Sequence, residues 1–196
     1  MPYYFEHCPK FSKVKQTVHN NHLEYIANNL NKVQNIISLT GPLAQLHYTR
    51  FKYHFSNFEN LYIFEILPNT FDAIKSDILR LPNSKVFNMN LLSVWPTFVS
   101  SVDYIDLDAT NNLTELHINN ICSMLKNNFK SLNKKLALSL CFPIKPIRRG
   151  KAKYFESIIE NIFDYANLDT VDFLETEYRN EYSPYTMNYN TLILKK

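Results

Sequence analysis

Short apolar runs alternate along this chain with longer stretches in which apolar residues recur about every 3.6 positions. Such short runs are typical of strands, and the periodic stretches are typical of amphipathic helices. The predicted strands are Asn35–Leu39, Leu61–Ile66, Ser84–Asn88, a segment within Val102–Asn112, Lys135–Phe142, Thr170–Tyr178 and Thr186–Leu194. The predicted helical stretches are residues 12–33, 42–57, 68–79, 113–129 and 155–165.

This alternation predicts an α/β fold, in which helices on both faces cover a seven-stranded and mostly parallel sheet. The last two predicted strands are joined by the turn-like residues 179–184 without a helix, so they must form an antiparallel hairpin at the C-terminus. No internal repeat, linker or low-complexity block divides the chain. We therefore predict a single domain over residues 1–196, in which residues 1–33 form an N-terminal arm and helix.

The stretch Val102–Asn112 joins strand-forming apolar residues to three carboxylates. Asp106 and Asp108 come at its carboxyl end, the edge of an open α/β sheet where ligands bind, which makes both candidate catalytic acids. They could equally be solvated acids, and Asp108 could cap the helix that follows. Asp103 precedes most of the strand and is expected to be a solvated end residue.

The composition narrows the possible functions. Hydrophobic residues make up 45% of the 196 positions and charged residues 20%, as in a globular protein. The two glycines, Gly41 and Gly150, are too few for a Walker-type phosphate loop or a full G-x-G-x-x-G fingerprint. A net charge of +3 permits contact with nucleic acid without requiring it. The abundance of Asn, Ile and Tyr suggests an AT-rich genome, such as that of a virus or mobile element.

The cysteines and histidines show no metal-ligand spacing. Three widely separated cysteines indicate reduced thiols in a cytosol. His19 and His22 lie three residues apart on a polar face of the predicted helix, so we expect surface histidines and no metal site. Without a signal-peptide pattern or an apolar run of about 20 residues, the sequence predicts a cytoplasmic protein with no membrane contact, in the host cytoplasm if it is viral. The oligomeric state stays open.

The order of these elements, with an acid ending the second strand and acids ending the fourth, resembles the class I S-adenosylmethionine-dependent methyltransferases, which have a Rossmann-like fold. The resemblance covers residues 32–196 and rests on the order and spacing of the elements. It implies S-adenosylmethionine as cofactor and methyl transfer as activity. The stretch Tyr104–Asp108 is similar to the fourth strand of some RNA-modifying members, but it lacks the Asp/Asn-Pro-Pro-aromatic motif of amino-methylating enzymes.

The resemblance also implies a set of cofactor-binding residues. Glu65 matches the acid that binds the ribose hydroxyls, where a carboxylate offers two acceptor oxygens to a vicinal diol. The loop after the first strand matches at Gly41 but lacks the usual preceding acid and the other glycines. A catalytically inactive relative that binds a ligand or serves a structural role therefore remains the alternative. The implied cofactor-binding residues are Thr40, Gly41, Glu65, Asn88, Asn90 and Asp108.

A basic segment at residues 145–153 follows the fifth predicted strand, at the same edge of the sheet as Asp108. Arginine and lysine bind phosphate well, so this segment predicts contact with a nucleic acid, although a solvated loop is the alternative. Its five cations are Lys145, Arg148, Arg149, Lys151 and Lys153.

Overall fold

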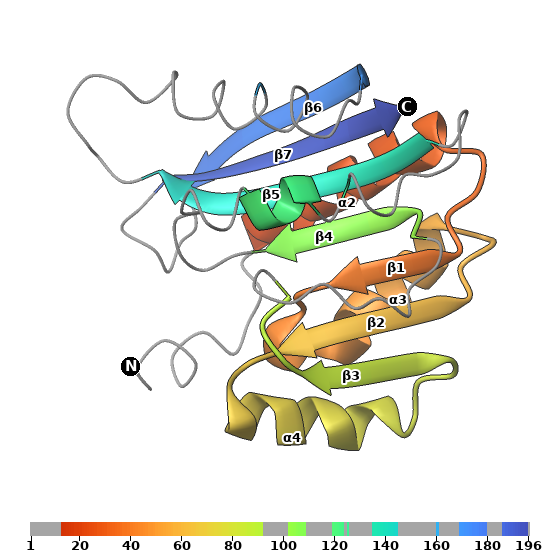
Figure 1. The fold of residues 1–196 in the computed structure, drawn as a ribbon, viewed down its shortest axis with the longest axis vertical. Coiled ribbons are helices and arrows are strands. Elements are labelled where there is room, and N and C mark those ends of the chain that lie inside the picture. Colours follow the sequence, from red (N-terminus) through yellow and green to blue (C-terminus); the bar gives the residue numbers. More distant parts are fainter. Residues whose placement is uncertain are drawn as a thin grey trace.

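The computed structural model describes residues 13–91, 102–108, 119–123, 125, 135–144, 160, 169–179 and 186–195. Its strands are β1 (Asn35–Ser38), β2 (Asn60–Glu65), β3 (Ser84–Asn88), β4 (Tyr104–Asp108), β5 (Lys135–Ile144), β6 (Asp169–Arg179) and β7 (Thr186–Lys195). Its helices with full bounds are α2 (Lys13–Asn29), the 3-10 helix η1 (Gly41–Leu43), α3 (Ala44–His54) and α4 (Pro68–Ile78). The seven strands form one sheet in the order β3-β2-β1-β4-β5-β7-β6 (Figure 1).

The first five strands are mutually parallel, and β7 runs antiparallel to both β5 and β6. The predicted fold class and C-terminal hairpin are therefore confirmed. Strand β7 inserts between β5 and β6, so β6 lies at the edge of the sheet. The strand order also changes direction at β1, whose two neighbours are β2 and β4.

Two apolar layers cover the two faces of the sheet. One face packs against α2, α3 and α4 through residues such as Leu23, Phe51 and Ile74. The other face packs against helical residues 119–123 and 125, among them Ile121 and Leu125. Figure 1 shows α2 and α3 behind the sheet and these helical residues in front of it. The prediction of helices on both faces is thus confirmed.

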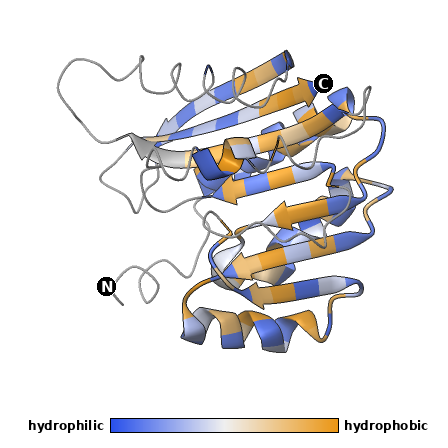
Figure 2. Ribbon diagram, in the orientation of Figure 1, coloured by the Kyte–Doolittle hydropathy of each residue, from blue (hydrophilic) through white to orange (hydrophobic). Residues whose placement is uncertain are grey.

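Side chains alternate between these layers along β4, as the pleat of a strand requires. Ile105 and Leu107 join the layer that contains Ile121 and Leu125, whereas Tyr104 joins the layer of α2 and α3. Asp106 therefore points to the side of α2 and α3. Figure 2 shows hydrophobic segments along the inner strands, such as β4 and β5, whereas much of the edge strand β6 is hydrophilic.

The predicted helix at residues 42–57 is divided in the structure. Gly41 has a φ of +53° and begins η1, and α3 follows from Ala44. The helix ends at His54 because Phe55 is extended, with a φ of −119° and a ψ of 98°. None of the helices in the described part of the chain is both long and apolar enough to cross a membrane.

Candidate functional site

The carboxyl edge of the sheet has a step at β1. This strand ends at Ser38, which pairs with Ile63 of β2 on one side and Asp106 of β4 on the other. Both neighbours continue for two more residues, to Glu65 and Asp108. Because the strand order changes direction at β1, this step lies at the topological switch point, where open α/β sheets bind their ligands.

Gly41 forms the turn that leaves the step. A φ of +53° is accessible to glycine but strained for most other residues. A Cβ atom at this position would meet no heavy atom within 4 Å, so the backbone angle alone selects glycine here. Thr40 is buried and donates a 3.1 Å hydrogen bond to the Gly41 carbonyl. The backbone of this turn therefore has space beside it.

Glu65 ends β2 on the other side of the step and is held by local hydrogen bonds. Its Oε1 accepts hydrogen bonds of 2.8 Å from the backbone amides of Ile66 and Leu67. Those two apolar side chains are 56% and 43% exposed. Asn88 pairs with Glu65 in the sheet and is exposed, and Asn90 follows it, partly buried. The predicted cofactor residues of β2 and β3 thus lie near one another at the edge of the sheet.

Asp108 ends β4 and forms an ion pair with Lys15 of α2. Burial alone would lower the pKa of the Lys15 ammonium, but the Asp108 carboxylate raises it above its ordinary value. Cys141 pairs with Asp108 in the sheet, and burial raises the pKa of its thiol well above the usual range. Asp108 lies at the edge as predicted, with a helix cation already bound to it.

Asp106 does not lie at the edge, and its predicted position there is wrong. It stands level with Ser38, two residues before β4 ends, and is fully buried. Its Oδ2 accepts a 3.0 Å hydrogen bond from Ser38 Oγ, and its Oδ1 accepts one of 3.0 Å from the Tyr189 hydroxyl. Burial raises the pKa of this carboxyl, but nearby His19 and His47 and the Ser38 hydroxyl outweigh it and hold the pKa at about 2. Asp106 is a buried carboxylate with no face open to a methyl acceptor.

Asp106 belongs to a buried polar row that crosses four strands. Ser38, Asp106, Ser139 and Thr191 are partners in successive strand pairings from β1 to β7. Ser139 and Thr191 share a hydrogen bond of 2.7 Å, and the Tyr104 hydroxyl donates to Ser139 at 3.1 Å. All five residues are buried, so these bonds satisfy polar groups that water cannot reach.

Two histidines of α2 pack onto this row, and their predicted place on the surface is wrong. His19 is 2% exposed and His22 is fully buried. The ring nitrogens of His22 lie 2.8 Å from Thr191 Oγ1 and 3.0 Å from Thr176 Oγ1. A signal for this burial exists in the sequence, because each histidine lies four positions from an apolar residue of the helix stripe, His22 from Val18 and His19 from Leu23.

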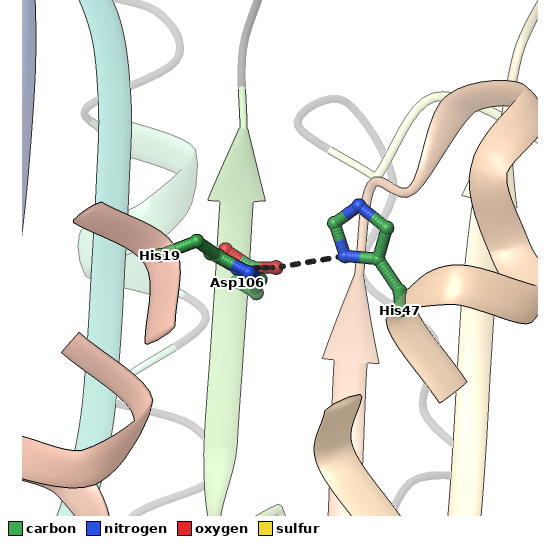
Figure 3. Close-up of side chains that lie close together, drawn as sticks. All are labelled: His19, His47 and Asp106. Carbon is green, nitrogen blue, oxygen red and sulfur yellow. Dashed lines mark ion pairs between the residues drawn. The ribbon is translucent and has the colours of Figure 1, made fainter. Parts of the chain in front are cut away.

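His47 of α3 joins His19 beside Asp106, an arrangement that sequence spacing did not indicate (Figure 3). His19 Nε2 lies 3.5 Å and His47 Nδ1 lies 3.9 Å from Asp106 Oδ2. Burial lowers the pKa of His47 to about 3, so its ring is neutral at physiological pH. The expectation that no metal site exists rested on linear spacing, whereas the fold gathers two imidazoles and one carboxylate that could hold a metal ion.

Asp103 also differs from its predicted role as a solvated end residue. Its Oδ2 accepts hydrogen bonds of 2.9 Å from the backbone amides of both Gln34 and Asn35. It therefore links the start of β1 to the start of β4.

The five predicted nucleic-acid-binding cations at residues 145–153 lie outside the described residues.

No known family model matches the sequence, and no curated protein resembles it in sequence. Solved structures do resemble its fold. A candidate RNA methyltransferase from Pyrococcus horikoshii superposes with a TM-score of 0.61 at 11% identity, covering 95% of this chain and 88% of that one. TYW2 from M. jannaschii in complex with AdoMet gives 0.59 at 9% identity, covering 90% and 75%.

A third similar structure is the N-methyltransferase NodS from Bradyrhizobium japonicum WM9 in complex with S-adenosyl-L-homocysteine, with a TM-score of 0.58 at 11% identity. The superposition covers 98% of this chain and 91% of NodS. These likenesses and the strand order show that the chain has the fold of the class I S-adenosylmethionine-dependent methyltransferases. The fold implied by the sequence resemblance is confirmed.

Proposed function

We propose that this protein binds S-adenosylmethionine at the step above β1 and transfers its methyl group to an acceptor. The observation that carries the proposal is Glu65, a carboxylate at the end of β2 beside the topological switch point. Similar structures of this fold have been solved with AdoMet or S-adenosyl-L-homocysteine bound. The cofactor supplies an electrophilic methyl group on a sulfonium centre.

Glu65 is suited to bind the ribose hydroxyls of this cofactor. Two backbone amides fix Oε1, which orients the whole carboxylate. Among the residues that the structure describes, no donor reaches Oε2, so this oxygen can accept from a vicinal diol. The backbone of Thr40 and Gly41 would approach the methionine part, and Asn88 or Asn90 would meet the adenine.

The contribution of the chain to methyl transfer would be positioning and the exclusion of water. Asp108 is the carboxylate nearest the edge on β4, so it could orient or deprotonate an acceptor. Its ion pair with Lys15 must open or rearrange for that role. Asp106 would instead have a structural role, through its hydrogen bonds with Ser38 and Tyr189.

Calorimetric titration of S-adenosyl-L-homocysteine into wild type and Glu65→Gln tests cofactor binding. The variant keeps an oxygen for the two backbone amides but loses the charge and one acceptor, so binding should weaken roughly tenfold or more. Glu59→Gln is the matched control, because Glu59 is an exposed acid just before the opposite end of β2. No heat from the wild type at millimolar ligand contradicts cofactor binding, and unchanged affinity in Glu65→Gln contradicts the ribose assignment.

We further propose a nucleic acid as the acceptor. The support is the basic segment at residues 145–153 and the likeness to a candidate RNA methyltransferase. Binding to RNA should weaken in Arg148→Ala/Arg149→Ala and with rising salt, since phosphate contacts release counterions. The control is Lys52→Ala/Lys85→Ala, which removes two exposed cations from α3 and β3. Equal binding by both double variants would remove the segment from the acceptor site.

A binding or structural protein without catalysis is the second candidate function. The ion pair between Lys15 and Asp108, the burial of Asp106 and the single glycine after β1 favour it. Labelled S-adenosylmethionine distinguishes the two candidates when it is incubated with total RNA and protein extract. Cofactor binding without transfer of label supports the second candidate, and transfer of label excludes it.

A further inference from the structure

Three potential ligand atoms converge below the step, on the side of the sheet covered by α2 and α3. They are His19 Nε2, His47 Nδ1 and one carboxylate oxygen of Asp106, all within 4.8 Å of one another. The three side chains are 2%, 1% and 0% exposed, and they come from α2, α3 and β4. Figure 3 shows both imidazoles directed at the carboxylate.

The chemistry of this set suits a divalent first-row metal. Imidazole nitrogen and carboxylate oxygen bind zinc with bonds of about 2.0–2.2 Å, which puts ligand atoms about 3.3 Å apart in a tetrahedron. The measured separations from Asp106 Oδ2 are 3.5 Å to His19 and 3.9 Å to His47. Shifts of a few tenths of an ångström would bring the two distances to Asp106 to this value, and the two ring nitrogens, which lie within 4.8 Å of each other, would close by up to about 1.5 Å.

Neighbouring residues fix the orientation of the Asp106 carboxylate, as they do for carboxylate ligands in metal sites. Ser38 and Tyr189 each donate one hydrogen bond to Asp106, which fixes the orientation of its oxygens. His19 Nε2 is buried and has no hydrogen-bond partner among the described residues. Asp106 Oδ2 lies 3.5 Å from this nitrogen, longer than a normal hydrogen bond, and a metal ion bound by both atoms would satisfy the nitrogen better.

Arg50 opposes coordination by His19. Its Nη1 lies 3.4 Å from His19 Nδ1. Coordination through Nε2 leaves the proton of the neutral ring on Nδ1, where it would face another donor. The Arg50 side chain must move away from Nδ1 when a metal binds. A residue at position 50 that accepts a hydrogen bond from Nδ1 would therefore strengthen metal binding.

We propose that His19, His47 and Asp106 form a buried binding site for one zinc-like divalent ion, which links α2 and α3 to the centre of the sheet. The three protein ligands leave at least one coordination position to water or another small ligand. The site is independent of methyl transfer, because none of its ligands lies at the carboxyl edge of the sheet.

The test uses the full chain after dialysis against a chelator, with Zn²⁺ or Co²⁺ alone as the probe. We expect one equivalent to bind, with a rise in the melting temperature and, for Co²⁺, ligand-field absorption bands of low coordination number. His47→Phe removes a ligand but keeps an aromatic ring against Phe51, so it should fold and bind more than about 100-fold more weakly. His54→Phe, in the last turn of the same helix, is the control and should bind like wild type.

Arg50→Gln provides a second test that does not depend on a lost ligand. The Gln carbonyl can accept from His19 Nδ1, so the variant should bind the metal several-fold more tightly. Absence of stoichiometric binding by the folded, metal-free wild type would overturn the site. Wild-type affinity in both His47→Phe and Arg50→Gln would assign the bound ion to other residues and would also overturn it.

Discussion

The hydroxyl of Tyr189 provides the sharpest measure of how the buried Asp106 carboxylate is stabilised. In Tyr189→Phe the ring stays in place, and the carboxylate loses the 3.0 Å bond to its Oδ1. Hydrogen bonds to charged groups contribute about 1.5–3 kcal/mol, so we expect a loss of about 2 kcal/mol in the free energy of unfolding. For a chain of 196 residues this corresponds to a fall of roughly 4–8 °C in the melting temperature.

The matched control is Tyr178→Phe on the adjacent strand β6. Tyr178 is also buried, but within the described part of the chain its hydroxyl has a single hydrogen-bond partner, the weak acceptor Cys141 Sγ, at 3.5 Å. Its loss should cost less than about 1 kcal/mol. Urea denaturation of both variants, in a chelating buffer that removes any bound metal, gives the two free energies. Equal losses, or a loss below about 0.5 kcal/mol for Tyr189→Phe, would refute the reasoning that this bond stabilises a buried charge.

Two further predictions concern α2. Burial, with a smaller contribution from the charge of His19, lowers the pKa of His22 from 6.5 to about 4, so the folded state favours its neutral ring. The contribution of this group to the free energy of unfolding is complete above pH 6.5 and falls by roughly 3 kcal/mol as the pH drops towards 4. Urea titrations at several pH values should show this fall in the wild type and a flatter profile in His22→Gln. Lys15→Met leaves the Asp108 carboxylate, whose side chain is only 14% exposed, without its ammonium, and should cost about 1–2 kcal/mol in the same assay. Lys15→Met/Asp108→Asn should recover most of that loss.

Each of these two predictions has an outcome that contradicts it. A pH profile of His22→Gln that superposes on that of wild type would mean that His22 does not titrate in this range. A double variant at positions 15 and 108 that is no more stable than Lys15→Met would mean that the ion pair does not explain the loss.

The local pattern of the sequence was sufficient to predict the strands and the sense in which most of them run. Apolar runs such as Lys135–Phe142 and the short link between the last two strands carry this information in neighbouring residues. The register between strands does not lie in neighbouring residues. Asp106 was predicted at the edge because it is near the end of its own strand, but the pairing with Ser38 sets its depth in the sheet.

The histidine cluster illustrates the same limit. His19, His47 and Asp106 come from three elements far apart in the sequence, so no linear spacing indicates that they meet. The helix stripe around His19 contains a signal for its burial, because Leu23 lies four positions later, but the polar residue type led to the prediction of a surface position. Glu65 was easier to place, since the end of β2 and the predicted edge coincide.

The buried row from Ser38 to Thr191 also bears on how the strands find their partners during folding. Apolar parallel strands pair well in several alignments, and a shift of two residues keeps every side chain on its own face. Such a shift would set the Asp106 charge opposite Ile36 and leave its hydroxyl donors behind. We therefore expect the row to destabilise misaligned sheets more than it stabilises the native sheet. In this way a buried charge that is costly in itself would favour one register of β1 with β4.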